Sequence, residues 1–296
     1  NTWIFPLKQL HGERLNGNDY RLTADADYGG EPLGITLDVL ALDKDRWGAG
    51  AEVAIRLSAP ESGSTVKLAG TLQGSDEFFN YTLELDAAYR DVSEFLKGFE
   101  GGAKLAGKLR LHGTMVGDTS GFVLSEATFV LDNMPEYGFE AGGWLNYRLS
   151  GESAIELLAT GELASLSYLV DWVDLDVGDF GRAQSSAHIT GTLDRPVLEE
   201  FRLLTGNAAG LTISLSGQLN LFDAGPDQSE SVFFDLHGPS LAVLSHWLGD
   251  LPYEPGPWSA SGLLSGDRQQ IALRDIVVET GTPDTVMIRA TGAIET

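Results

Sequence analysis

Cysteine is absent from this chain of 296 residues, which excludes disulfide bonds, thiolate metal sites and cysteine nucleophiles. Basic residues are scarce: 19 Lys and Arg stand against 43 Asp and Glu, for a formal net charge of −24. A protein that binds nucleic acid or adsorbs to an anionic bilayer needs a basic footprint. The composition therefore predicts neither nucleic acid nor an anionic membrane surface as a partner.

Long apolar runs are also missing, since no stretch approaches the roughly 18 residues that a membrane-spanning helix needs. The chain starts at Asn1 without a secretory signal, and Met287–Glu295 still alternate like a strand at the other end. We therefore expect a segment of a longer protein, whose membrane anchor or targeting segment lies outside this sequence.

Motifs that carry chemistry are not found. No two histidines stand at metal-ligand spacing, and the chain has neither a G-x-S-x-G nucleophile elbow nor a phosphate-binding loop. The acidic run Asp174, Asp176 and Asp179 lacks the EF-hand pattern. The sequence therefore predicts no enzyme, no metal and no cofactor.

What the chain does have is a repeat of about 75 residues, visible as four sets of matched positions. In each set the spacings are 74 and then 75 residues. The sets are Phe95, Leu169 and Leu244; Leu124, Leu198 and Leu273; Glu126, Glu200 and Asp275; and Gly143, Gly217 and Gly292. Acids that recur in every copy indicate a structural role, because an active site seldom repeats with a fold period.

Each copy is predicted to contain one short α-helix followed by strands. The expected helices are Val92–Phe99, Leu166–Leu175 and Ser240–Leu248. Gly70 is the counterpart of Gly143 in a weaker first copy. The resulting organisation is an N-terminal β segment at 1–88 and repeat copies at 89–164, 165–239 and 240–296, the last truncated, in one continuous structure.

Apolar and polar residues alternate with period 2 along most of the chain. In Thr212–Leu221, Ile213, Leu215, Gly217, Leu219 and Leu221 share one face, and the residues between them are polar. Phe139–Leu149 and Lys104–His112 follow the same pattern. Such alternation is typical of antiparallel sheets with one apolar and one solvated face.

The apolar faces of so many strands have to be shielded from water, and three short helices are too few to cover them. Either two sheets pack as a sandwich, or one sheet curls around its own apolar side and leaves a groove. Periodicity alone does not choose between them.

The stretch from Asp235 to Gly281 and the strand that follows resemble the C-terminal repeat of the AsmA family. The matching pieces are Gly238-Pro239-Ser240-Leu241, Leu251-Pro252, Gly256-Pro257-Trp258, Ser261-Gly262, Leu273-Arg274-Asp275-Ile276 and Gly292. The copies that begin near Val92 and Leu166 match more loosely. Gly281-Thr282-Pro283-Asp284 departs from the family's final hairpin.

The resemblance implies a mainly β fold: an elongated, curled antiparallel sheet of such repeats with a hydrophobic groove. AsmA-like proteins, including TamB-type and YhdP-type relatives, are anchored in the inner membrane of diderm bacteria and extend into the periplasm. They are thought to carry phospholipids towards the outer membrane. The expected partners are thus phospholipid or fatty-acyl chains, with envelope proteins besides, and membrane contact only through parts of the parent protein outside this chain.

The candidate groove residues are the apolar members of the alternating strands. They are Leu105, Leu109, Leu111, Phe139, Leu145, Tyr147, Leu149, Ile189, Leu193, Ile213, Leu215, Leu219, Leu221, Val232, Phe234, Leu236, Val286 and Ile288. The alternative is a structural or adhesive β-repeat protein with a closed core and no lipid. A glycan-active enzyme on a β scaffold is a third hypothesis, which no paired-carboxylate motif supports.

Overall fold

The computed structural model describes residues 7–28, 31–40, 50–60, 62–74, 79–92, 106–133, 135–165, 181–193, 195–206, 210–220, 230–240, 256–266, 271–281 and 288–295. Within these ranges the fold is mainly β, with 17 strands that pair antiparallel, and the described sheet is not closed. The chain divides into two compact units, residues 1–133 with 140–154 and residues 134–139 with 155–296.

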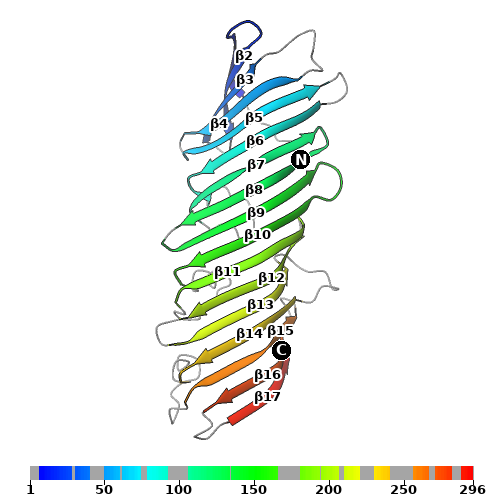
Figure 1. Ribbon diagram of the computed structural model, residues 1–296. Coiled ribbons are helices and arrows are strands. Elements are labelled where there is room, and N and C mark those ends of the chain that lie inside the picture. The colour runs from blue at the N-terminus through cyan, green and yellow to red at the C-terminus, as the bar shows by residue number, and fades with distance from the viewer. Residues whose placement is uncertain are drawn as a thin grey trace. The chain divides into compact units, whose positions relative to one another are not determined.

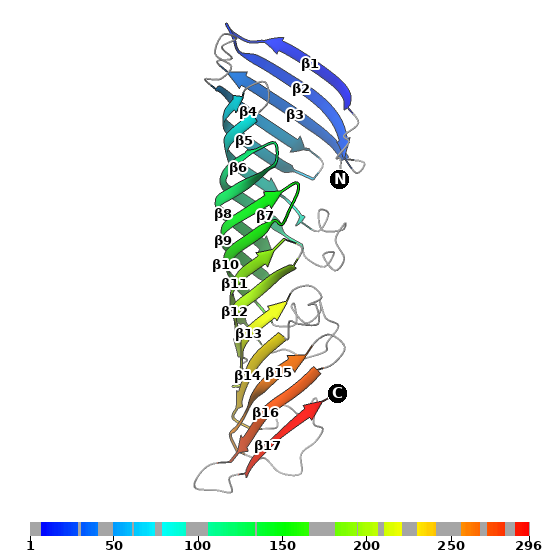
Figure 2. The same cartoon turned by 90° about the vertical axis from the view of Figure 1, so that its right-hand side faces the viewer.

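The first unit holds the strands from β1 to most of β9 (Figure 1). They are β1 (Leu7–Arg14), β2 (Tyr20–Tyr28), β3 (Glu31–Leu40), β4 (Ala51–Ala59), β5 (Ser64–Gly74), β6 (Phe79–Tyr89), β7 (Lys108–Asp118), β8 (Gly121–Asn133) and β9 (Tyr137–Arg148). From β1 to β8 each strand pairs antiparallel with the next one in the chain. Figure 2 shows β1, β2 and β3 side by side within this unit.

The contact of β9 with β8 within this unit is marked by one hydrogen bond and one ring pair. The Leu149 N–H donates to the Ser120 carbonyl oxygen at 2.9 Å. The rings of Phe122 and Tyr147 lie 5.4 Å apart between centroids. The antiparallel order therefore continues from β8 to the main part of β9.

The second unit holds the start of β9 and the remaining strands. They are β10 (Ala154–Leu163), β11 (Ala183–Thr192), β12 (Arg195–Gly206), β13 (Thr212–Asn220), β14 (Glu230–Gly238), β15 (Trp258–Gly266), β16 (Ile271–Thr280) and β17 (Ile288–Glu295). From β11 onward each strand pairs antiparallel with the next. At Gly161 on β10, an added Cβ would meet both Phe139 and Ser185, so β10 lies between the start of β9 and β11.

Tight hairpins explain why neighbouring strands pair in chain order. Between β7 and β8, Asp118 lies opposite Gly121 and its carboxylate accepts a hydrogen bond from the Ser120 N–H at 2.6 Å. The bonds from Ser120 lower the pKa of Asp118. Between β11 and β12, the Thr192 hydroxyl oxygen accepts from the Arg195 N–H at 3.2 Å. Side chains of Asp and Thr commonly close turns in this way.

The mainly β, antiparallel fold is confirmed. The strand expected at Lys104–His112 begins four residues later, at Lys108, and runs to Asp118. The three predicted helices fall almost wholly outside the described residues, which are nearly all in strands and turns.

Candidate functional site

In the first unit, the strand register aligns apolar side chains into rows that cross several strands on one face. One row consists of Leu22, Leu37, Ile55, Leu68 and Leu85. A second consists of Ala24, Ile35, Leu57, Val66, Ala87, Leu111 and Phe129, and a third of Tyr20, Val39, Val53, Gly70, Leu83, Met115 and Leu124. Cross-strand neighbours lie close enough to pack, so the rows form one apolar surface.

The second unit carries an apolar face of the same kind. Its rows are Ala183, Thr205, Ile213, Leu236, Ala260, Val278 and Ala290; Ser185, Leu203, Leu215, Phe234 and Gly262; and Phe201, Gly217, Val232, Leu264, Leu273 and Ile294. Together, the rows of each unit are its apolar face.

Side chains of the apolar face are unevenly covered. A strip of small and medium side chains is buried, with 3% exposure at Val53, 4% at Leu83 and 3% at Leu124. Most other members are half-buried. In the second unit, Leu203 and Val232 are buried as well, each 4% exposed, whereas Ile294 at its last strand is 53% exposed. The described part of the face is therefore covered in some places and open in others.

Eleven of the candidate groove residues lie in described strands with described side chains. They are Leu109, Leu111, Phe139, Leu145, Tyr147, Ile189, Ile213, Leu215, Val232, Phe234 and Leu236. Ile288 opens β17 and is 49% exposed. For Leu219 the backbone pairing with Leu198 is described.

The remaining candidates lie elsewhere. Leu193 is in the turn after β11. Leu149 follows the end of β9 and is 68% exposed, because the alternating pattern of the sequence runs on into the turn. Leu105, Leu221 and Val286 lie outside the described residues.

Three acidic residues adopt a backbone conformation that is uncommon for residues with a side chain. The angle φ is +51° at Glu126, +49° at Glu200 and +51° at Asp275. They stand in β8, β12 and β16, and each coincides with a shift in strand register. The left-handed region costs an L-residue roughly 1–2 kcal/mol, so the surrounding strands must impose it.

These register shifts are β-bulges, which sequence reasoning did not predict. In β12, Leu198 faces Leu219 and Phe201 faces Gly217, so the strand accommodates one extra residue and keeps both apolar side chains on the apolar face. A signal was present: the two apolar residues are three positions apart, which breaks period 2. The recurrence of the acids indicated a structural role but not this geometry.

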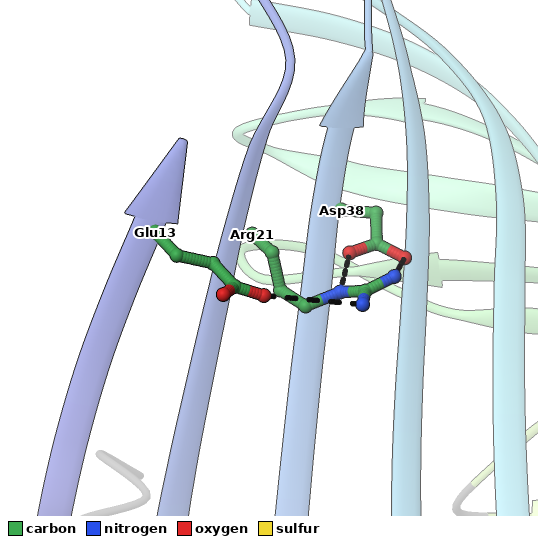
Figure 3. Close-up of polar contacts among 3 residues, drawn as sticks. All are labelled: Glu13, Arg21 and Asp38. Atoms are coloured by element: carbon green, nitrogen blue, oxygen red, sulfur yellow. Dashed lines mark hydrogen bonds and ion pairs between the residues drawn. The ribbon is translucent and has the colours of Figure 1, made fainter. Parts of the chain in front are cut away.

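The opposite face of the first unit is polar and includes an ion-pair cluster on three strands (Figure 3). Arg21 Nε donates to Asp38 Oδ1 at 2.6 Å and Arg21 Nη2 donates to Asp38 Oδ2 at 3.0 Å, a two-point contact. Glu13 Oε1 lies 4.0 Å from Arg21 Nη1. The hydrogen bond from Arg21 lowers the pKa of Asp38, and the hydrogen bond with Asp38 raises the pKa of Arg21.

Within the described ranges, no three His, Asp or Glu side chains are grouped so that they could hold a metal ion. The same ranges contain no helix that is both long and apolar enough to cross a bilayer.

Comparison with protein-family models, with curated proteins and with solved structures returned no match.

Proposed function

We propose that the apolar face shields the acyl chains of phospholipids, and that this chain is a segment of an AsmA-like periplasmic lipid conduit. The observation that carries the proposal is the combination of long, mostly apolar rows with incomplete burial. The rows cross seven strands in each unit's longest example, from β2 to β8 and from β11 to β17. Members such as Leu22, 42% exposed, remain open to a ligand.

The energetics of lipid transfer favour such a surface. An acyl chain of about 16 methylenes, at roughly 0.8 kcal/mol each, needs on the order of 13 kcal/mol of shielding from water. A sheet that curls around its apolar side would supply this along a continuous groove while the headgroup stays in solvent. No side chain has to recognise the headgroup, which agrees with an apolar face made of aliphatic and aromatic residues.

The spacing of the β-bulges supports the proposed repeat. Glu126, Glu200 and Asp275 have nearly the same φ and stand in every fourth strand. A unit of about 75 residues with four strands and one bulge would therefore account for both the sequence repeat and this geometry. In the proposed assembly, copies of this unit extend the groove between the inner and outer membranes, where the chain would serve outer-membrane biogenesis.

The runner-up is a structural or adhesive β-repeat protein with a closed core. The observation in its favour is the buried strip that includes Val53, Leu83 and Leu124. If that strip belonged to a sealed core, a hydrophobic fluorophore would not bind the native protein.

The decisive experiment places a charge on the apolar face. Leu215→Asp and Leu145→Asp should abolish crosslinking to a photoactivatable phospholipid while the far-UV circular dichroism stays β-rich. Ser216→Asp, one residue away from Leu215 on the polar face and opposite Arg202, is the matched control and should crosslink normally. In a closed core, burying the new carboxylate would unfold the protein instead.

Lipid content gives a second measurement on the unmodified chain. Native mass spectrometry should detect bound phospholipid or fatty acid after purification. Delipidated protein that neither retains nor takes up either ligand would contradict the proposal.

A further inference from the structure

A depression beside the polar side chains of the first unit is lined by three cations and two threonines, together with Asp38, two alanines, Ile55 and Leu68. Its volume is about 550 Å³, and it spans β2 to β5. Ala54 and Ala69 are paired across β4 and β5 and stand beside longer polar side chains. Two small residues next to each other leave the space that the neighbouring side chains surround, and the volume is within the usual range for ligand sites.

The strand register brings four polar side chains into one row along this depression. Thr23 faces Thr36, Thr36 faces Arg56, and Arg56 faces Lys67. All four line the depression. The row therefore offers two hydroxyl groups, a guanidinium group and an ammonium group on the same side of the sheet.

Arg56 and Lys67 form a pairing that folding alone would not favour. Like charges directly opposite each other on adjacent strands destabilise a sheet. Arg21, the third cation of the depression, is satisfied by Asp38. In the described part of the chain, neither Arg56 nor Lys67 forms an ion pair, although Asp86 lies opposite Lys67 on β6.

In a chain with a net charge of −24, two adjacent cations that form no ion pair in the described structure need a reason. We propose that this depression binds a phosphate group, either inorganic phosphate or a phosphate monoester. The guanidinium fork of Arg56 can donate two hydrogen bonds to phosphate oxygens, Lys67 supplies a second positive charge, and the hydroxyl of Thr36, the neighbour of Arg56, can donate to a remaining oxygen.

The phosphate site is independent of the proposed lipid function. Arg56 stands between Ile55 and Leu57, which belong to rows of the apolar face, and successive strand residues point to opposite sides. A phospholipid whose acyl chains lay on the apolar face would not place its headgroup in this depression. Either proposal can therefore fail without the other.

The test uses the full chain at low ionic strength, because screening weakens exposed charge interactions. Isothermal titration with inorganic phosphate should give a Kd on the order of 1 mM. The double variant Arg56→Gln/Lys67→Gln should weaken it at least about tenfold, since both charges that hold the anion are lost. Arg110→Gln removes an exposed cation of the same face outside the depression, and should change the Kd by less than about twofold.

A second arm uses glycerol 3-phosphate, which has no acyl chain and cannot bind the apolar face. Binding tighter than that of inorganic phosphate would assign a monoester as the ligand, and equal binding would assign the phosphate group itself. A Kd weaker than about 10 mM for both ligands would overturn the proposal. Equal losses in the double variant and in Arg110→Gln would also overturn it, because they would indicate unspecific attraction.

Thermal unfolding gives an independent signature. Without phosphate, Arg56→Gln should raise the Tm, because it removes the like-charge pair and the other cross-strand neighbour of Arg56, Thr36, is uncharged. With phosphate in excess, the unmodified chain should gain Tm and Arg56→Gln should gain less. An Arg56→Gln variant that loses stability without phosphate would contradict the inference that these cations are held together for a ligand.

Discussion

Leu203 and Leu204 are neighbours on β12, yet they have opposite surroundings. Leu203 lies on the apolar face opposite Leu215 and is 4% exposed, whereas Leu204 lies on the polar face opposite Ser214 and is 52% exposed. The two residues are both leucine and are adjacent in the chain. At this point of β12 the side of the sheet to which a residue points decides its burial, and the two faces should respond differently here to the same change.

The largest effect is expected from truncation on the apolar face. Leu203→Ala should lower the free energy of unfolding by about 2–4 kcal/mol, because it removes buried methyl groups and leaves a cavity. Leu204→Ala should lower it by less than about 0.5 kcal/mol. Urea denaturation monitored by circular dichroism measures both. Similar losses for the two variants would mean that the faces do not differ in packing.

A smaller difference in stability is expected between substitutions at Gly217 and Gly292, which occupy the same position in the proposed repeat. A Cβ at Gly217 would lie 2.1 Å from the Ser231 carbonyl oxygen, whereas a Cβ at Gly292 would meet nothing within 4 Å. The difference arises because β13 has a strand on each side, while β17 pairs with β16 in the described structure. Gly217→Ala should therefore cost about 1–3 kcal/mol of unfolding free energy.

Gly292→Ala is the control for Gly217→Ala and should be neutral or stabilising by up to about 0.5 kcal/mol, since alanine restricts the unfolded chain. The Tm and the urea midpoint of the two variants measure the difference. Equal destabilisation by both substitutions would contradict the asymmetry between an interior strand and an edge strand.

The smallest effect is expected at the β-bulge of β12, which keeps Leu198 and Phe201 on the same face of the sheet. Glu200→Gly should raise the free energy of unfolding by about 0.5 kcal/mol, because glycine adopts φ near +50° without the strain that glutamate bears. Glu199→Gly, at the neighbouring exposed position with no positive φ, should lower it by about 0.5–1 kcal/mol. Urea denaturation measures the change in unfolding free energy for both variants. Changes of opposite sign would support the assignment of the bulge, and changes of the same sign would contradict it.

Period-2 alternation was sufficient to predict many strands and their faces. The strand expected at Thr212–Leu221 is β13, Thr212–Asn220, and Ile213 and Leu215 are on its apolar face. Alternation also misled where it continues beyond a strand, as at Leu149. It could not reveal the bulges, because an extra residue is defined only by the partner strand that lacks it.

The proposed phosphate site depends even more on cross-strand pairing, which alternation does not predict. Arg56 and Lys67 belong to separate strands, and no sequence pattern singles out either residue. Their pairing depends on the register of the β4–β5 hairpin, and a shift of one residue would move Lys67 to the other face. Local alternation contains no information on that register.

By itself, the sequence determined that this chain forms antiparallel strands with one apolar and one polar face, because side-chain direction alternates along every strand regardless of its partners. The tertiary structure alone decided which residues meet across strands, where a bulge admits an extra residue, and how far each apolar side chain is covered. These properties depend on atoms from distant parts of the chain, and only the folded sheet brings those atoms together.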